Sequence, residues 1–182
     1  MTLHSITPVN EEILFGQDEI IVSKTDLQGR LTYVNDVFCR VAEMSTQDVI
    51  DQPQSIIRHP DMPRAIFKLL WDTIQAGEEI FAYVKNMSKS GKFYWVFAHV
   101  TPSFDEQGKI IGYHSNRRSP DKGEITAISS IYRSLITEEN RHPNSKTGMA
   151  ASFTFLQDML EEKGQTYSEF VWALRSENNA DF

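Results

Sequence analysis

The segment "FAYVKNMSKSGKFYWVFAHVT", residues 81–101, decides the fold. Two runs rich in aromatic and β-branched residues flank Ser-Lys-Ser-Gly at 88–91, a composition typical of a hairpin turn. A third run, "KIIGYHSNR" at 109–117, follows a second group of turn residues at 105–108. Three consecutive strands joined by short turns predict an antiparallel sheet.

The residues before this segment supply further strands and helices. "EIIVSKTD" and "GRLTYVND" predict a first hairpin at 19–35, and short helical pieces follow, one with a capping box of Ser45 and Asp48. One longer helix is expected from Pro63 to Ala76, ended by Gly77. Two strands, small helices, a long helix and three strands predict an α+β fold, a five-stranded antiparallel sheet with helices on one face.

Side-chain alternation within the strands predicts which face of the sheet receives a ligand. Val96 and Ala98 share a face of small residues, whereas the phenylalanines and tryptophan of the same strand point the other way. We therefore expect a cavity on the small-residue face. The same alternation assigns Asn86 to that face, and we expect Gly112 and His114 of the third strand to lie there too.

A polar loop, "RHPDMP" at residues 58–63, precedes the long helix. Asp61 can cap this helix, so that free backbone N–H groups and the positive end of the helix dipole lie near Arg58 and His59. Such a helix start would suit an anion such as a dinucleotide pyrophosphate. The alternative is a surface salt bridge between Arg58 and Asp61 that only fixes the loop.

Composition excludes several classes of protein. The formal net charge is −7 and the pI is near 5.2, without a basic block, which argues against nucleic-acid binding. No window reaches the roughly 18 uninterrupted apolar residues of a membrane span, and a cytoplasmic protein is expected. A single cysteine, Cys39, excludes an internal disulfide and a cysteine metal cluster. The sequence lacks the residue patterns of hydrolases, phosphate-binding loops and metalloenzymes, so an enzyme is not expected.

Four stretches together resemble the PAS sensor domain of bacterial aerotaxis receptors over about residues 20 to 138. They are "TDLQGRLTYVND", "IIRHPDMPRAIFKLLWDTIQAGE", "VKNMSKSGKFYWV" and "EITAISSIYRSL". In that family the domain binds FAD and reports the redox state of the cell, so the resemblance implies a flavin site here. The cofactor-binding residues that it implies are Asn35, Arg58, His59, Asp61, Trp71 and Asn86.

Two features of the implied site stay open in the sequence. His114 could hydrogen-bond a flavin edge from the small-residue face, or it could be an ordinary buried histidine with a protein partner. The family usually has Pro-Trp after the Gly-Glu that ends the long helix, whereas this chain has Glu79-Ile80. A PAS gas sensor with haem ligated by His59 or His114, and a cofactor-free interaction module, remain alternatives.

The predicted domains are an N-terminal cap at 1–18, a sensor domain at 19–121 and a helical extension at 122–182. The extension contains "KGEITAISSIYRSLITEEN", a linker at 141–148, and two further helices, "MAASFTFLQDMLEEKG" and "TYSEFVWALRSENN". These helices are too apolar for a free tail. They are expected either to pack on the domain or to form a dimer or partner-docking surface, and of these a homodimer is preferred. Output in chemotactic signal transduction is expected to pass to a separate signalling partner protein.

Overall fold

The structure, a computed structural model, describes residues 6–178, with side chains described to residue 175. Residues 1–5 of the predicted N-terminal cap lie outside the described residues. The chain forms two compact units, and the division groups part of the predicted sensor domain with the predicted extension. The first unit contains the residues up to 60 and 74–120, and the second contains 61–73 and the residues from 121 onward.

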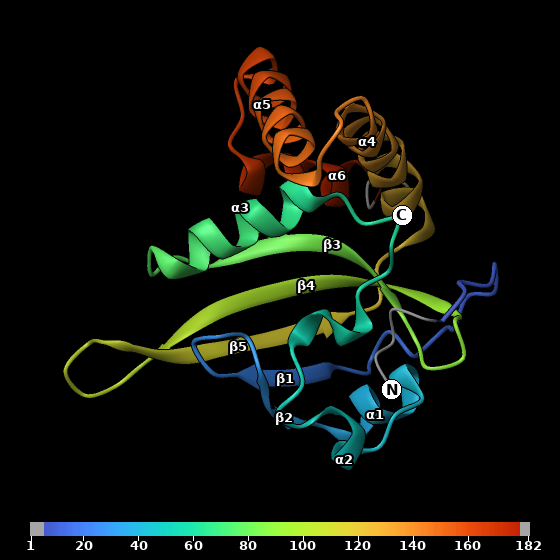
Figure 1. The fold of residues 1–182 in the computed structure, drawn as a ribbon, viewed down its shortest axis with the longest axis vertical. Helices are drawn as coiled ribbons and strands as arrows, with labels where there is room; N and C mark the ends of the chain where they lie inside the picture. The colour runs from blue at the N-terminus through green and yellow to red at the C-terminus, as the bar shows by residue number, and fades with distance from the viewer. Residues whose placement is uncertain (1–5, 179–182) are drawn as a thin grey trace. The chain divides into compact units, whose positions relative to one another are not determined.

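The first unit contains a five-stranded antiparallel sheet in the order β2-β1-β5-β4-β3, which Figure 1 shows as neighbouring arrows. Both predicted groups of strands are present, so the predicted α+β fold is confirmed. The strands are β1 (Ile21–Thr25), β2 (Leu31–Val34), β3 (Ile80–Met87), β4 (Phe93–Phe104) and β5 (Ile110–Arg118).

The turns of the β1–β2 and β4–β5 hairpins are built alike. The carboxylates of Asp26 and Asp105 each accept hydrogen bonds of 2.8–3.0 Å from the backbone N–H groups two and four residues later. Gly29 and Gly108 follow with φ values of 76° and 78°, in the left-handed region that glycine enters without steric cost. Local chemistry therefore closes both hairpins, and this is why the sequence predicted them.

Three short helices follow β2, as the sequence predicted. Ser45 accepts from the backbone N–H of Asp48, and the Asp48 carboxylate accepts in return from the Ser45 backbone, which is the predicted capping box. The helices are α1 (Asp36–Ala42), α2 (Thr46–Val49) and the 3-10 helix η2 (Gln54–Ile57).

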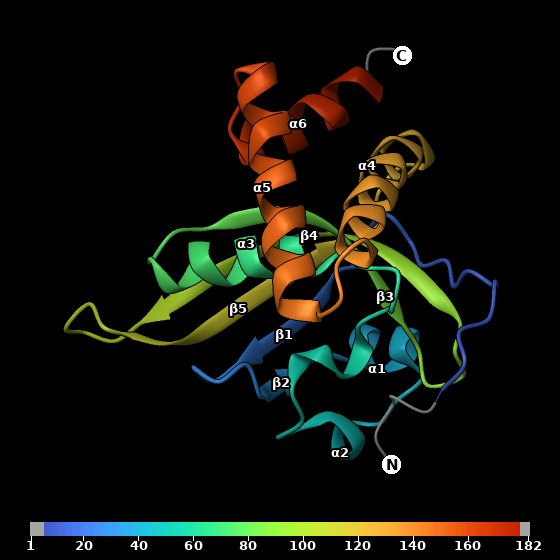
Figure 2. The same ribbon diagram turned by 45° about the horizontal axis from the view of Figure 1, so that its top comes forward.

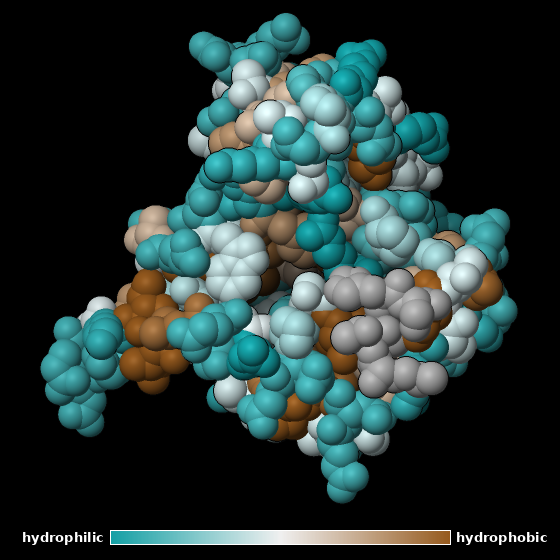
Figure 3. All heavy atoms as spheres, in the orientation of Figure 1, coloured by the Kyte–Doolittle hydropathy of each residue, from teal (hydrophilic) through white to brown (hydrophobic). Residues whose placement is uncertain are grey.

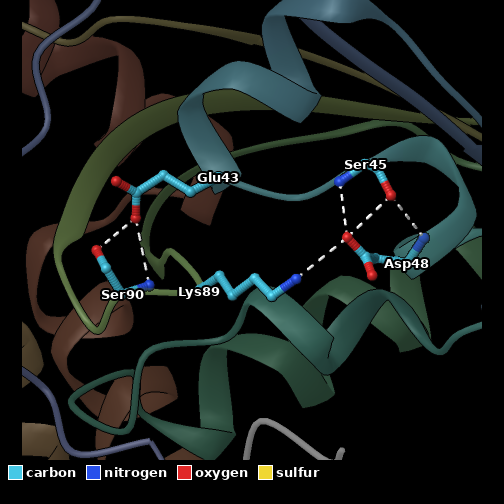
Figure 4. Close-up of polar contacts among 5 residues, drawn as sticks. All are labelled: Glu43, Ser45, Asp48, Lys89 and Ser90. Carbon is cyan, nitrogen blue, oxygen red and sulfur yellow. Dashed lines mark hydrogen bonds and ion pairs between the residues drawn. The ribbon is translucent and has the colours of Figure 1, made fainter.

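The turn between β3 and β4 is fastened to the α1–α2 segment (Figure 4). Glu43 accepts hydrogen bonds from the Ser88 hydroxyl at 2.7 Å, from the backbone N–H of Ser90 at 3.2 Å and from the Ser90 hydroxyl. These hydrogen bonds, the Ser90 hydroxyl's above all, lower the pKa of the Glu43 carboxyl. The Lys89 ammonium lies 3.3 Å from the Asp48 carboxylate. One end of the sheet is thereby tied to the short helices.

The N-terminal segment runs beside the same turn. The backbone N–H of Val9 donates to Gly91 at 2.9 Å, and the backbone N–H of Ile13 donates to Phe93 at 2.8 Å. Gly91 has φ +88°, and a Cβ atom at this position would lie 2.5 Å from the Thr7 carbonyl oxygen. Only glycine therefore fits where the N-terminal segment meets the turn.

We predict that Gly91→Ala lowers the free energy of unfolding by about 2–4 kcal/mol, through backbone strain and overlap with Thr7. Gly108→Ala is the matched control, because Gly108 also has positive φ but a Cβ there meets nothing within 4 Å. The control should lose only about 1 kcal/mol. Urea denaturation of both variants measures the difference, and equal losses would contradict the close approach.

The β4–β5 hairpin extends beyond the strands on either side of it. On β4, pairing with β3 ends at Val100, and on β5, pairing with β1 ends at Tyr113, so the residues between them pair only with each other. Phe104 and Ile111, on this extension, are 50% and 55% exposed. Figure 3 shows an apolar cluster on the projecting hairpin, next to its hydrophilic tip. The extension thus carries large apolar side chains outside the core.

The second unit contains four helices, and their caps explain their limits. Thr166 and Glu169 form the predicted capping box before the last helix. Among the helices within residues 6–178, none combines the length and the hydropathy that a bilayer-spanning segment requires. The helices are α3 (Arg64–Gln75, of which 64–73 belong to this unit), α4 (Lys122–Asn140), α5 (Ser145–Lys163) and α6 (Tyr167–Asn178).

The predicted linker at 141–148 is wrong in length, because α5 begins at Ser145. Asn144 caps this helix, since its side-chain oxygen accepts from the backbone N–H of residues 146 and 147. Gly148 lies within α5, where a Cβ would be 2.3 Å from the Glu139 carbonyl oxygen. Helices α4 and α5 therefore meet backbone to backbone, and Figures 1 and 2 both show them side by side.

Candidate functional site

One face of the sheet, which we call the Asn86 face, combines small apolar and polar side chains. Residues directly opposite each other in neighbouring strands share a face. Ala82 lies opposite Ala98, and Ala98 lies opposite Arg117 on its other side. The Asn86 face contains Ile80, Ala82, Val84 and Asn86 of β3, Tyr94, Val96, Ala98 and Val100 of β4, Tyr113, Ser115 and Arg117 of β5, and Ile21 and Ser23 of β1.

His114 lies on the opposite face, so the prediction that it shares a face with Asn86 was wrong. It is paired with Thr101, and its Nε2 atom lies 3.0 Å from the side-chain oxygen of Asn116. The reason is a register shift between Ser103 and Phe104, beyond which β4 and β5 pair one residue out of step. A one-residue shift moves every side chain of a strand to the other face of the sheet. Here it places Tyr113 and Ser115, the neighbours of His114, on the Asn86 face in place of His114.

The absence of a side chain at Gly112 has a different structural role from the predicted one. It also lies on the face opposite Asn86, and a Cβ at Gly112 would be 2.4 Å from the Thr25 carbonyl oxygen. The missing side chain therefore lets the end of β1 approach β5 beside the register shift. Gly112 does not make room for a ligand on the Asn86 face.

Arg117 is a buried cation on the Asn86 face, only 5% exposed. Its Nη2 atom donates to the Ser23 hydroxyl at 2.8 Å, and the Ser23 hydroxyl donates to Gln54 at 3.2 Å. The guanidinium carbon lies 5.9 Å from the centre of the Phe38 ring. Burial lowers the pKa of Arg117 to about 10, opposed by Tyr94, so the guanidinium is charged at neutral pH. In the described part of the chain, no carboxylate forms an ion pair with it.

Three buried polar atoms of the Asn86 face have no hydrogen-bond partner within the described residues. They are Asn86 Nδ2, Ser115 Oγ and Arg117 Nη1. Buried polar groups are nearly always paired, so three orphaned atoms on one face require an explanation. All three can donate, and the side chains of Ala82 and Ala98 between them are small. This set suits a flat ligand whose edge carries carbonyl or ring-nitrogen acceptors.

Three of the predicted residues, Arg58, His59 and Asn86, lie together at the free edge of β3. The backbones of Arg58 and Asn86 form an isolated antiparallel β-bridge. The backbone N–H of His59 donates to the Lys85 carbonyl at 3.3 Å. The His59 side chain is 3% exposed, and its ring lies edge-on to Phe93 with centroids 6.2 Å apart. The "RHPD" loop thus extends the sheet beside Asn86.

The side-chain amide of Asn35 forms structural hydrogen bonds with the backbone. Its side-chain oxygen accepts from the backbone N–H groups of Val22 at 3.0 Å and Phe38 at 3.1 Å, and its amide nitrogen donates to the Ile20 carbonyl at 2.8 Å. The residue is the N-cap of α1 and joins that helix to β1. We interpret Asn35 as a positioning residue, because Phe38 of the same helix lies over Arg117.

Asp61 and Trp71 belong to the second unit. Because α3 begins at Arg64, residue 63 precedes the helix directly and Asp61 lies two residues further back in the loop. The backbone N–H of Ala65 instead donates to the Glu139 carboxylate of α4 at 3.1 Å. A carboxylate of the chain itself therefore occupies part of the helix start predicted to bind an anion. Trp71 is half-buried on α3.

Sequence reasoning missed Arg117, Ser115 and Ser23. Ser115 and Arg117 alternate with His114 and Asn116, and they were missed because Gly112 and His114 were expected on the Asn86 face. A usable signal was present, since Gly112 close to the turn is typical of a bulge.

Comparisons with known proteins agree with the fold. Residues 31–117 match the family model described as PAS fold. Over 120 residues the chain is 42% identical to the aerotaxis receptor of Escherichia coli, which covers 66% of this chain and 24% of the receptor. It is 26% identical over 102 residues to a nitrogen fixation regulatory protein of Klebsiella pneumoniae, covering 56% of this chain and 21% of that protein. The chain thus spans about a quarter of these relatives' length.

Solved structures show the same fold at low sequence identity. A light-oxygen-voltage domain from a study of a flavin analogue has a TM-score of 0.54 at 15% identity, covering 68% of this chain and 87% of that one. A PAS domain from Colwellia psychrerythraea has a TM-score of 0.52 at 19% identity, covering 57% and 87%. At these identities the likeness is one of fold.

We predict that the two asparagines differ in their effect on stability. Asn35→Ala should lower the free energy of unfolding by about 2–4 kcal/mol, because it removes a helix cap and leaves backbone groups unpaired. Asn86→Leu should leave the stability of the ligand-free protein unchanged or raise it, since its buried Nδ2 has no partner to lose. Urea denaturation compares them, and a large loss for Asn86→Leu would mean that Asn86 is structural.

We predict that Glu139→Ala exposes the backbone N–H of Ala65 and speeds its hydrogen exchange by about fivefold, the equivalent of roughly 1 kcal/mol for a lost cap. Glu138→Ala is the control, because Glu138 pairs with Arg141 and His142 at the end of α4. Exchange followed by NMR reports the single amide. Equal protection of Ala65 in both variants would show that the Glu139 contact contributes nothing.

Proposed function

Residues 31–117 of this chain form a PAS domain, and we propose that this domain binds FAD and reports its redox state. The observation that carries the proposal is the set of three unpartnered buried donors on the Asn86 face. The similarity to the aerotaxis receptor, 42% identical over 120 residues, supports the proposal. Flavin, when bound, supplies reversible uptake of electrons.

The residues of the chain would divide the work of holding the isoalloxazine ring. The Asn86 amide and the Ser115 hydroxyl donate hydrogen bonds to acceptors on its edge, and Arg117 adds a charged donor. The alanines and valines of the Asn86 face leave space for a flat ring. Arg58 and His59, beside Asn86, are suited to the polar part of the cofactor.

A change in the charge of the ring would be felt by β3 and β5, which carry these donors. A donor that changes its hydrogen bond biases the position of its strand, and a partner that binds one arrangement better reads the change. We propose that the output passes to a signalling protein in the cytoplasm, with a second copy of the chain as the dimer partner. We propose no enzymatic activity.

The test is the absorption spectrum of the purified protein, before and after reduction with dithionite, with identification of any released chromophore. The proposal expects flavin bands that bleach reversibly and FAD in the supernatant after denaturation. A Soret band would favour the haem gas sensor. A colourless protein that takes up no added flavin would favour a cofactor-free interaction module.

We predict that Asn86→Leu retains at least tenfold less FAD than the wild type, because the hydrophobic side chain leaves an acceptor of the ring unpaired. Asn116→Leu is the matched control, since Asn116 lies on β5 of the same sheet with its side chain on the opposite face. Fluorescence titration with FAD gives both affinities. An equal loss in the two variants would argue against a ligand on the Asn86 face.

A further inference from the structure

We propose that Arg117 tunes the flavin site by charge, so that the protein binds the reduced, electron-rich ring more tightly relative to the oxidised ring than it would without this cation. The inference rests on the proposed function and deepens it, because it assigns the control of the reduction potential to one side chain. It starts from the burial of Arg117 without a carboxylate partner.

A buried charge is costly unless another group compensates it. Removing a cation from water costs several kcal/mol even in a relaxed protein interior, and a facing anion or strong acceptor normally offsets this cost. Among the described residues, the groups that interact with Arg117 are the neutral Ser23 hydroxyl, the Phe38 ring and the protonated Tyr94. The site therefore lacks negative charge, and a ligand that gains electron density there supplies it.

The guanidinium is held in place before any ligand arrives. One nitrogen, Nη2, is fixed by Ser23, which is itself held by Gln54 of η2. The other, Nη1, is buried and has no partner among the residues that the structure describes. A donor fixed in this way stabilises developing charge without the cost of reorganisation. This distinguishes Arg117 from Arg118, which is exposed on the opposite face of the same strand.

Reduction of the ring takes up two electrons with one or two protons. In the experiment dithionite supplies the electrons, through a mediator dye, and water supplies the protons. A cation within reach of the ring favours the product of electron uptake over the oxidised ring, since the electron density rises where the cation lies. The potential of the bound flavin is therefore higher with Arg117 than with a neutral side chain of similar size.

The experiment measures the midpoint potential of bound FAD against a reference dye in the wild type, Arg117→Met, Arg117→Lys and Arg118→Met. We expect Arg117→Met to lose about ten- to a hundredfold in affinity for reduced relative to oxidised FAD, which lowers the potential by about 30–60 mV for a two-electron couple. Arg117→Lys should keep most of the wild-type value. Arg118→Met, the matched control, should equal the wild type.

Separate results overturn the inference and the proposed function. If the wild type binds FAD and Arg117→Met has the same potential as the wild type, the inference fails and the flavin site stands. If neither the wild type nor any variant binds flavin, both the proposed function and the inference fail. If neither Arg117 variant folds, Ser23→Ala replaces them. It frees the guanidinium from its anchor, so the fixed charge that the inference requires is lost, and a potential equal to that of the wild type would overturn the claim that a fixed Arg117 sets it.

Discussion

A one-residue register shift between β4 and β5 determines the chemistry of the sheet. Beyond the shift, Ala98 is paired with Arg117 and Val100 with Ser115, so the arginine and the serine share the face of Asn86. Without the shift, His114 and Asn116 would stand there instead, because side chains alternate with a period of two. The exposed Ile111 and the glycine after it lie at the shift, where the strand has one residue more than its partner.

The face that results from this pairing contains unpaired donors and a buried positive charge. An apolar core of the same size would have been more stable, since each unpaired buried polar group costs about 1–3 kcal/mol. These groups are nevertheless held in place by specific contacts. Asn35 fixes the start of α1, α1 places Phe38 over the guanidinium, and Ser23 binds its other nitrogen. Such an arrangement is typical of a binding site, where polar groups are satisfied by the ligand.

The second unit contributes a different constraint. Residues 61–73 are grouped with the C-terminal helices, and the Glu139 carboxylate caps the first turn of α3 from α4. Helix α5 then meets Glu139 through Gly148, which has no side chain to keep the backbones apart. Residue 139 therefore contacts both α5, the next helix in the sequence, and α3, which is distant from α4 in the sequence.

The sequence by itself determined the elements and their order. Turn residues such as Asp105 and Gly108, and the capping boxes at Ser45 and Thr166, act through neighbours within a few residues, so their effect can be inferred without a fold. Alternation also grouped Asn86 with Val96 and Ala98, because one hairpin with a regular turn joins them.

Only the tertiary structure decided which residues of different strands face each other and that a distant carboxylate caps α3. The position of Arg117 depends on pairing with β4 after a shift that local propensity does not specify, and the cap of α3 depends on a carboxylate 74 residues away in the sequence. Both are long-range contacts. Their geometry depends on how whole strands and helices pair and pack. Local sequence determines the turns, the caps and the alternation of side chains within one element, because these depend on residues that are close together in the chain.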